Sequence, residues 1–413
     1  MPADRTSDDV FEQILDFSSR ADPYPLYAAL RETPVTRRED GTWVVSTYRE
    51  IVELLHDPRL SSDRRNLAHR PEGDAAGGAG GVSFIGQDPP EHDRLRRLAM
   101  RHFGPPHTPG RIEALRPEML AITTELIDGL AGRTRADVVD DVAYPLPVTV
   151  ICRVLGVPRE DESRFHAWAD AIVETLGPGE SDRAERERAR ADATSKLQTY
   201  LAGLAAARRE SPGDDMLSGM ATYEGPEGGM TPVEVIATSA LLLVAGHETT
   251  VNLIANGMLT LLRHPGLLKR LRAEPDLIIT TVEELLRYEP PVHFLSSRVT
   301  LADIPVAGTT IPAGAPVVLV LASGSRDPAH VSHPDTFDPD RRYSEHLGFG
   351  GGVHYCFGAA LARLEAQIVL QQLVNRLVNP RLVEDPPPYR PSATLRGPRH
   401  VLVDYDGVTP AAV

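Results

Sequence analysis

Apolar residues recur every three to four positions through much of the chain, which is the spacing of an amphipathic helix. The longest such stretch starts at Thr231 and Pro232, a residue pair typical of a helix start. It runs for roughly thirty residues, interrupted only by Gly246 and Gly257, and a helix of that length is expected to be buried at the centre of the protein. The predicted helices are Tyr48–Leu55, Glu91–Phe103, Arg111–Leu130, Glu160–Thr175, Asp182–Arg209, Thr231–Arg263 and Pro275–Tyr288.

Short apolar segments toward the two ends of the chain predict strands at Thr42–Ser46, Val317–Leu321 and Val401–Asp404. Ala302–Pro316 is punctuated by proline and glycine and predicts turns and hairpins. The glycine-rich stretch 71–82 predicts a flexible loop. It is not a phosphate-binding loop, because no Gly-Lys-Ser/Thr follows it. With no repeat and no interdomain linker, we expect a mainly α protein with small peripheral β-sheets (α+β), formed by residues 1–413 as a single domain.

The composition excludes several classes of protein. The 413 residues are 41% hydrophobic and 24% charged, which is ordinary for a globular chain long enough to enclose a large prosthetic group. A net charge of −15 argues against non-specific binding to nucleic acid. The chain shows no signal peptide and no apolar run of the ~18–20 residues that a membrane span needs. These features predict a soluble, cytoplasmic protein with neither a membrane nor a nucleic-acid partner, and two cysteines cannot build a disulfide framework.

The sharpest local feature is the segment Phe349–Gly358, FGGGVHYCFG, which leads into the apolar run Ala359–Ala362. Glycines ahead of Cys356 let the backbone turn tightly and bring its N–H groups near the sulfur. A helix beginning at Cys356 would add the positive end of its dipole, and both effects favour a thiolate over a thiol. Such a cysteine suits a soft metal ion, whereas a lone cysteine is more often simply a buried residue.

This segment fills every fixed position of Phe-Gly-x-Gly-x-His-x-Cys-x-Gly and resembles the haem-binding signature of the cytochrome P450 family of haem-thiolate monooxygenases. The resemblance implies the P450 fold and a heme b (iron protoporphyrin IX) between the long central helix and the cysteine-bearing loop. It implies Cys356 as the axial iron ligand, the thiolate favouring O–O cleavage. Phe349, Gly350 and Gly358 would be among the haem-binding residues. The size of the chain, without an anchor or a fused reductase, is similar to that of soluble bacterial members.

A second constellation, Ala245-Gly246-His247-Glu248-Thr249-Thr250, lies in the middle of the long helix. Glycine inside a helix costs roughly 1 kcal/mol relative to alanine, and close approach of a flat cofactor at Ala245 and Gly246 would explain it. A zinc protease is excluded, because no second histidine follows His247 at i+4. Read without the family, this is a threonine-rich turn of a buried helix. Within the family, Glu248 and Thr249 resemble the catalytic acid–alcohol pair that delivers protons during O2 activation.

Glu284 and Arg287 form a Glu-x-x-Arg pair, a spacing that recurs in this arginine-rich chain and usually marks a solvated contact. Their order, after the long helix and before the cysteine, is similar to that of the family's structural ion pair, and Arg341 resembles its partner. Haem propionates need cationic partners. The family resemblance assigns that role to His92 and Arg96, which share one helix face, and to Arg298 and His354.

Substrate contacts are expected from two sources. Leu241, Val244, Ala245 and Glu248 form one stripe of the long helix, which by itself is typical of plain core. In the family this stripe faces the distal side of the haem. By the same analogy an apolar pocket is completed by five further residues, with the loop 71–82 and the helices around 165–185 as its lid. The residues expected to bind substrate are Phe84, Ile85, Leu241, Val244, Val292, Phe294 and Leu395.

The resemblance implies a monooxygenase that hydroxylates or epoxidises a hydrophobic small molecule, such as a polyketide or macrolide, a terpenoid or a steroid. O2 would be the co-substrate, and electrons would come from NAD(P)H through a ferredoxin reductase and a ferredoxin. An acidic donor could dock on a basic patch at Arg94, Arg97 and Arg101, although a solvated helix face explains these arginines equally well. Two alternatives stay open: a peroxide-driven oxidase or oxidative-coupling enzyme, and a haem-thiolate sensor or binding protein.

Overall fold

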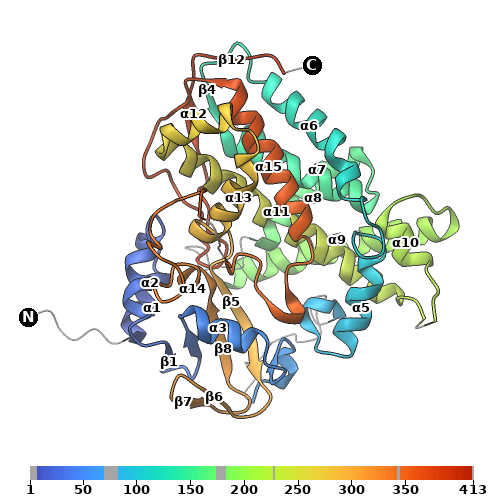
Figure 1. Cartoon of the computed structure of the whole chain (residues 1–413). Coiled ribbons are helices and arrows are strands. Elements are labelled where there is room, and N and C mark those ends of the chain that lie inside the picture. Colours follow the sequence, from blue (N-terminus) through green and yellow to red (C-terminus); the bar gives the residue numbers. More distant parts are fainter. Residues whose placement is uncertain (1–6, 69–81, 174–182, 227, 342–344, 412–413) are drawn as a thin grey trace, which may run out of the picture.

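One long helix, α11 (Pro232–Arg263), passes through the middle of the protein and organises its packing (Figure 1). The computed structural model describes residues 7–68, 82–173, 183–226, 228–341 and 345–411. The Thr231 side chain accepts a hydrogen bond from the Glu234 backbone N–H, and the Glu234 side chain accepts one from the Thr231 N–H. This reciprocal capping box fixes where α11 begins.

The remaining helices surround α11 or pack on the sheet at the N-terminal side of the molecule. Their bounds are α1 Ser7–Leu15, α2 Tyr24–Leu30, α3 Tyr48–Leu55, α5 Glu91–Met100, α6 Arg116–Asp128, α7 Pro145–Leu155, α8 Glu162–Val173, α9 Arg183–Glu210, α10 Met216–Thr222, α12 Pro265–Ala273, α13 Leu277–Tyr288, α14 Leu321–Gly324 and α15 Ala359–Arg376. Among the described residues, we find no helix long and apolar enough to cross a membrane.

The strands form one five-stranded sheet, in the order β1-β2-β8-β5-β3, and three smaller ones. Only β2 and β8 pair in parallel within the large sheet, which lies beside α1, α2 and α3 at the lower left of Figure 1. The strands are β1 Val35–Arg37, β2 Trp43–Val45, β3 Leu60–Ser61, β4 Arg135–Asp137, β5 Phe294–Thr300, β6 Ile304–Val306, β7 Thr309–Ile311, β8 Pro316–Val320, β9 Leu377–Val378, β10 Arg381–Leu382, β11 Leu402–Asp404 and β12 Gly407–Val408.

The predicted mainly helical fold with small sheets is confirmed, and the seven predicted helices correspond to α3, α5, α6, α8, α9, α11 and α13. The sequence pattern missed α7, whose prolines and β-branched residues are weak helix formers and whose residues are mostly buried, leaving no polar face to reveal a period. It also missed β5. That strand carries polar residues in its middle, where its pairing with β8 shifts register between Leu295 and Arg298.

A buried ion pair ties α13 to the chain segment that precedes the cysteine loop. Arg287 donates two 2.7 Å hydrogen bonds to Glu284, and both residues are buried. Arg287 also donates to the carbonyls of Pro334 and Thr336, while Glu284 accepts from the Asp338 N–H and pairs with Arg341 at 3.4 Å. The pair therefore fixes the path of residues 334–341, since a buried charge stays in place only while its partners do.

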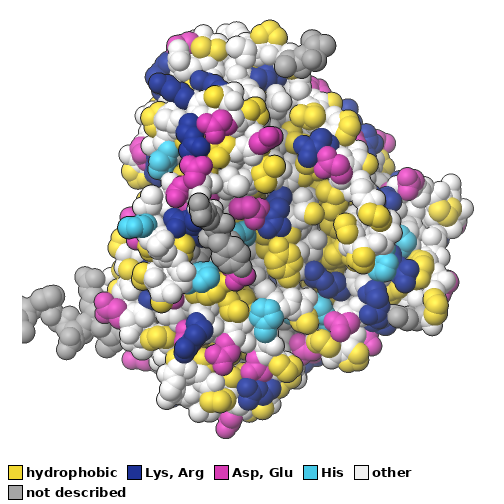
Figure 2. Space-filling view, viewed as in Figure 1, with side chains coloured by type: hydrophobic (Ala, Val, Ile, Leu, Met, Phe, Trp, Pro, Cys, Tyr) yellow, Lys and Arg dark blue, Asp and Glu magenta, His cyan; other side chains and the backbone are white. Residues whose placement is uncertain are grey.

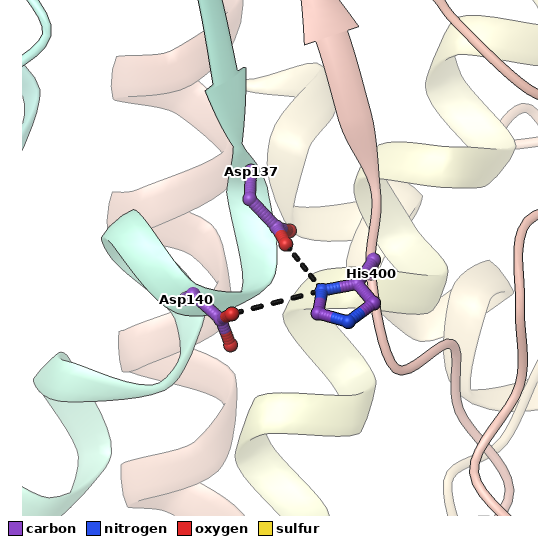
Figure 3. A group of neighbouring side chains, drawn as sticks. All are labelled: Asp137, Asp140 and His400. Carbon is purple, nitrogen blue, oxygen red and sulfur yellow. Dashed lines mark hydrogen bonds and ion pairs between the residues drawn. The ribbon is translucent and has the colours of Figure 1, made fainter.

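A second tie joins the residues just before β11 to β4 and the helical turn that follows it (Figure 3). The His400 imidazole lies between Asp137 and Asp140, with its Nδ1 2.6 Å and 3.6 Å from their carboxylates. Asp137 also accepts from the Val401 N–H, and Asp140 pairs with Arg399 at 2.6 Å. Because protein donors already engage both carboxylates, we interpret this trio as a structural link between β4 and β11.

Candidate functional site

A cavity of about 260 Å³ lies between α11 and the loop that carries Cys356. Ala245, Gly246 and Thr249 contribute to the α11 side of its wall, and residues 348–351 together with Cys356 contribute to the opposite side. The two motifs that the sequence analysis singled out, far apart in the chain, therefore face one space.

Two glycines in the left-handed region shape the cysteine loop, Gly350 with φ 67° and Gly352 with φ 63°. A Cβ on Gly352 would lie 2.0 Å from the Leu55 carbonyl oxygen, so only glycine lets the loop pack on α3. The Cys356 N–H donates to the Phe349 carbonyl at 2.9 Å, which closes the loop.

The helix after the loop begins at Ala359 and not at Cys356, so the predicted helix start on the cysteine is wrong. The difference arises because Gly358 takes the N-cap position. The Gly358 backbone N–H instead hydrogen-bonds the sulfur. Burial raises the pKa of the Cys356 thiol, and the Gly358 N–H, Arg96 and Arg363 offset that only in part. The protein alone therefore does not favour the thiolate, whereas a metal ion on the sulfur would deprotonate it.

Arg363 on α15 clamps the loop from the side of α13. Its guanidinium lies 4.5 Å from the centre of the Phe349 ring and donates to Glu283 at 2.6 and 2.9 Å. It also donates to the Tyr355 hydroxyl, and His346 contacts the Glu283 carboxylate at 3.2 Å. Burial would raise the pKa of Glu283, but the hydrogen bonds from His346 and Arg363 outweigh it and hold that pKa at about 2.

The acid and the alcohol on α11 face different surroundings. The Thr249 hydroxyl donates to the Ala245 carbonyl at 2.7 Å, one turn earlier, and both residues line the cavity. Glu248 is 2% exposed and does not line the cavity; its carboxylate contacts Asn252 and Arg390. A Cβ on Gly246 would meet Ile151 at 3.5 Å, an ordinary contact.

Donor side chains gather at one edge of the cavity. His92 is 1% exposed and its Nε2 has no hydrogen-bond partner within the described structure, while its ring packs 4.3 Å from that of His354. Arg96 donates to the Tyr355 carbonyl at 2.6 Å, and Arg298 is 8% exposed. The donor cluster, as we call it, consists of His92, Arg96, Arg298 and His354.

The pKa values of this cluster show that positive charge is crowded there. Burial, together with the nearby Arg298, His92 and Arg96, lowers the pKa of His354 to about 3. Burial likewise lowers the pKa of Arg298 to about 10, against the opposing effect of Asp88. Since burial penalises charge unless an opposite charge is near, the cluster fits a ligand that brings anionic groups.

The apolar part of the wall includes Phe84, Ile85, Leu241 and Val292 from the predicted pocket. Phe294 lies elsewhere, packed edge-on against Phe11 in the N-terminal core. The reason is that successive strand residues point to opposite faces, so the next residue, Leu295, lines the cavity instead.

Val244 and Leu395 also lie outside the cavity wall. Val244 is partly buried against the main core, because it precedes the cavity-lining Ala245 by about 100° around the helix. Leu395 forms a bridge with Val292 and so stands beside the wall. The predicted lid lies largely outside the described residues, since these exclude 69–81 and 174–182.

Three polar residues near the site escaped the sequence analysis. Arg390 and Asn252 contact Glu248 and belong to no motif, so no sequence signal marks them. Glu365 lines the cavity from α15, and burial raises its pKa to about 8, which keeps the carboxyl group neutral. An acidic residue between apolar Leu364 and Ala366 was a signal that could have been noticed.

Comparison with known proteins identifies relatives of the whole chain. Residues 184–403 match the family model described as Cytochrome P450. The chain is 40% identical to the cytochrome P450 monooxygenase PikC of Streptomyces venezuelae over 91% of this chain and 89% of that one. It is 39% identical to the vitamin D(3) 25-hydroxylase of Pseudonocardia autotrophica over 85% of each. Its structure is similar to that of ligand-free CYP164A2 of Mycobacterium smegmatis, with a TM-score of 0.86, 38% identity and coverage of 96% of this chain and 100% of the other.

The contacts of Glu283 with Arg363 and His346 predict a pH-dependent contribution to the stability of the fold. The folded-state pKa of Glu283 is about 2, below the usual 4.5, so the stabilisation is present above pH 4.5 and is lost as pH falls toward 2. Glu283→Gln should lower the free energy of unfolding at pH 7 by on the order of 1–2 kcal/mol, discounted because the side chain is partly exposed. In urea titrations this gap to the unsubstituted protein should shrink between pH 5 and pH 3.

Glu187→Gln is the matched control, because Glu187 belongs to an exposed i,i+3 pair with Arg190. Glu187→Gln should have the same free energy of unfolding as the unsubstituted protein at both pH values. If Glu283→Gln lowers the free energy of unfolding by the same amount at pH 3 and at pH 7, the charge of the Glu283 carboxylate is not what stabilises these contacts.

Proposed function

This chain belongs to the cytochrome P450 family and is a P450 monooxygenase, and from that premise we propose that it inserts one atom of O2 into a hydrophobic small molecule. The observation that carries the proposal is the cavity that brings Cys356 opposite Thr249. The overall reaction consumes substrate R–H, O2, two protons and two electrons, and it releases R–OH and water.

The residues present fit the haem-thiolate cofactor that the family implies. Cys356 would supply the axial thiolate, and a thiolate-ligated haem supplies the activation of O2. The donor cluster would hold the two propionates, because His92 Nε2 is buried with no hydrogen-bond partner among the described residues and burial lowers the pKa of Arg298, both of which an anionic group would relieve. Phe349, Gly350, Gly358, Ala245 and Gly246 would complete the haem-binding surface, and residues 1–413 would form one domain around it.

Thr249 and Glu248 would carry protons to the cavity. The Thr249 hydroxyl lines the cavity and can both accept and donate, while Glu248 is the neighbouring ionisable group. A positioned acid–alcohol pair of this kind is suited to general acid catalysis. Glu284, Arg287 and Arg341 would act only by holding the segment ahead of the cysteine loop in place.

The substrate is proposed to be a hydrophobic secondary metabolite, such as a polyketide or macrolide, a terpenoid or a steroid. Phe84, Ile85, Leu241 and Val292 give the cavity an apolar wall that can recognise a molecule of this type. The activity named for the vitamin D(3) relative, a 25-hydroxylase, is consistent with such a ligand.

Electrons are proposed to come from NAD(P)H by way of a ferredoxin reductase and a ferredoxin. Figure 2 shows Lys and Arg side chains gathered over α5, the helix that carries Arg94 and Arg97 and is followed directly by Arg101. On a chain of net charge −15, such a local basic patch would steer an acidic donor toward the cysteine side of the site.

An absorption titration of the ferric, haem-loaded protein tests the substrate class. The panel contains macrolides, terpenoids, steroids and aromatic acids. We expect one of the first three classes to shift the spectrum from low to high spin, because an apolar ligand in the cavity would exclude water from a cofactor bound there. A shift with aromatic acids alone would contradict the proposed substrate class.

Thr249→Ala tests proton delivery. Removing the hydroxyl should lower product formed per NAD(P)H consumed about ten-fold and divert the reducing equivalents to hydrogen peroxide. Thr249→Ser keeps the hydroxyl and is the control that should retain coupling. Product, peroxide and NAD(P)H are measured with a surrogate ferredoxin system; turnover sustained far better by peroxide alone, or an unchanged balance in Thr249→Ala, would contradict the proposal.

A further inference from the structure

The Glu248 carboxylate is held by a part of the chain that no motif marks. Glu248 Oε1 lies 3.4 Å from Arg390 Nε and accepts a 3.4 Å hydrogen bond from Asn252 Nδ2. Arg390 comes from the segment 388–399, which is more than 100 residues away in sequence and lies between β10 and β11. The ion pair therefore attaches the centre of α11 to a surface turn near the C-terminus.

That turn is built so that Arg390 can reach Glu248. The Arg390 N–H donates to the Gly397 carbonyl at 3.0 Å, and a β-bridge joins Tyr389 to Pro398. A Cβ on Gly397 would lie 2.1 Å from Asn252 Oδ1, so glycine is required for the turn to pack against α11. The turn 388–399 therefore contacts both residues of α11: Arg390 lies next to Glu248, and Gly397 packs against Asn252.

The ion pair joins a buried acid to a partly exposed base. The Glu248 side chain is 2% exposed, whereas that of Arg390 is 17% exposed. Asn252 is fully buried, and its Oδ1 accepts no hydrogen bond from the described part of the protein. A buried acceptor next to a carboxylate needs a donor, because such groups are costly to leave unsatisfied.

The cavity lies on a different side of α11 from the turn 388–399. Adjacent helical positions are about 100° apart, so Thr249 faces the cavity while Glu248 faces the turn. Protons from bulk water that are to reach Thr249 through Glu248 have to arrive from the side of the turn. The guanidinium of Arg390 lies on that side of α11, beside Glu248.

We propose that Arg390 is a positioning residue for proton delivery, holding the Glu248 carboxylate at the edge of α11 where water reaches it through the turn 388–399. This inference rests on the proposed function, in which Glu248 passes protons to Thr249. Each proton that Glu248 gives to the Thr249 hydroxyl is replaced by one from water at this edge, so neither residue changes its charge over a full turnover. Arg390 stays protonated throughout.

The experiment compares Arg390→Gln and Arg390→Lys with the unsubstituted haem-loaded chain and with Glu248→Gln. The probe is the panel compound that gives the largest spin shift. Product, peroxide and NAD(P)H are measured in H2O and D2O and are normalised to haem content, so that loss of folded protein does not count. Arg399→Gln is the matched control, because Arg399 lies on the same turn but pairs with Asp140.

We expect Arg390→Gln to lower coupled turnover about ten-fold and to raise the solvent isotope effect toward that of Glu248→Gln, because both changes impair the same proton transfer. Arg390→Lys keeps the charge with one donor group instead of a fork and should give intermediate values. The double variant Glu248→Gln/Arg390→Gln should be no worse than Glu248→Gln alone, as residues that act in one step are not additive. Arg399→Gln should leave both readouts unchanged.

Four outcomes separate the possible failures. A normal solvent isotope effect in Arg390→Gln, with Glu248→Gln impaired, would overturn the role of Arg390 and leave the proposed function standing. Additive losses in the double variant would overturn it as well, since Arg390 would then act apart from Glu248. If Arg390→Gln does not retain haem, the proposal is tested with Arg390→Lys. Coupled turnover and a solvent isotope effect equal to those of the unsubstituted chain would then contradict it. No oxygenated product from the unsubstituted chain would instead contradict the proposed function.

Discussion

Positive charge buried at the edge of the cavity is the constraint on which the site depends. Arg96 and Arg298 lie there beside two histidines, and burial lowers the pKa of both arginines, an effect that Asp88 opposes at Arg298. Burial of this kind is costly unless an anion completes the site. We therefore interpret the cluster as one prepared for an anionic cofactor.

The rest of the structure keeps two distant chain segments on either side of that space. The long helix α11 forms one wall, and the buried pair of Glu284 and Arg287 fixes the segment that leads to the cysteine loop. Glycine at positions 350 and 352 then turns the loop, and Arg363 clamps it from α15. These contacts hold the chain around Cys356 at several separate points, so the position of Cys356 does not depend on any single one of them.

Periodicity predicted the helical class and the long helix, because it is a local signal, whereas the convergence of the two motifs was implied by the resemblance of the cysteine segment to a family signature. The helix start at Cys356 was placed wrongly, since the N-cap is taken by Gly358. Phe294 was assigned to the pocket although strand alternation turns its neighbour Leu295 there. Arg390 could not be found, because its contact with Glu248 spans more than 100 residues and depends on how a C-terminal turn packs.

The absorption spectrum of the reduced, CO-treated protein tests the central claim most directly, which is that Cys356 presents its sulfur to a haem in this cavity. The account predicts a thiolate-type spectrum for the unsubstituted chain and its loss in Cys356→Ser, with the Cys152→Ser control unchanged because Cys152 is buried in α7 away from the cavity. A spectrum without thiolate character in the unsubstituted chain, or one that survives in Cys356→Ser, would contradict it.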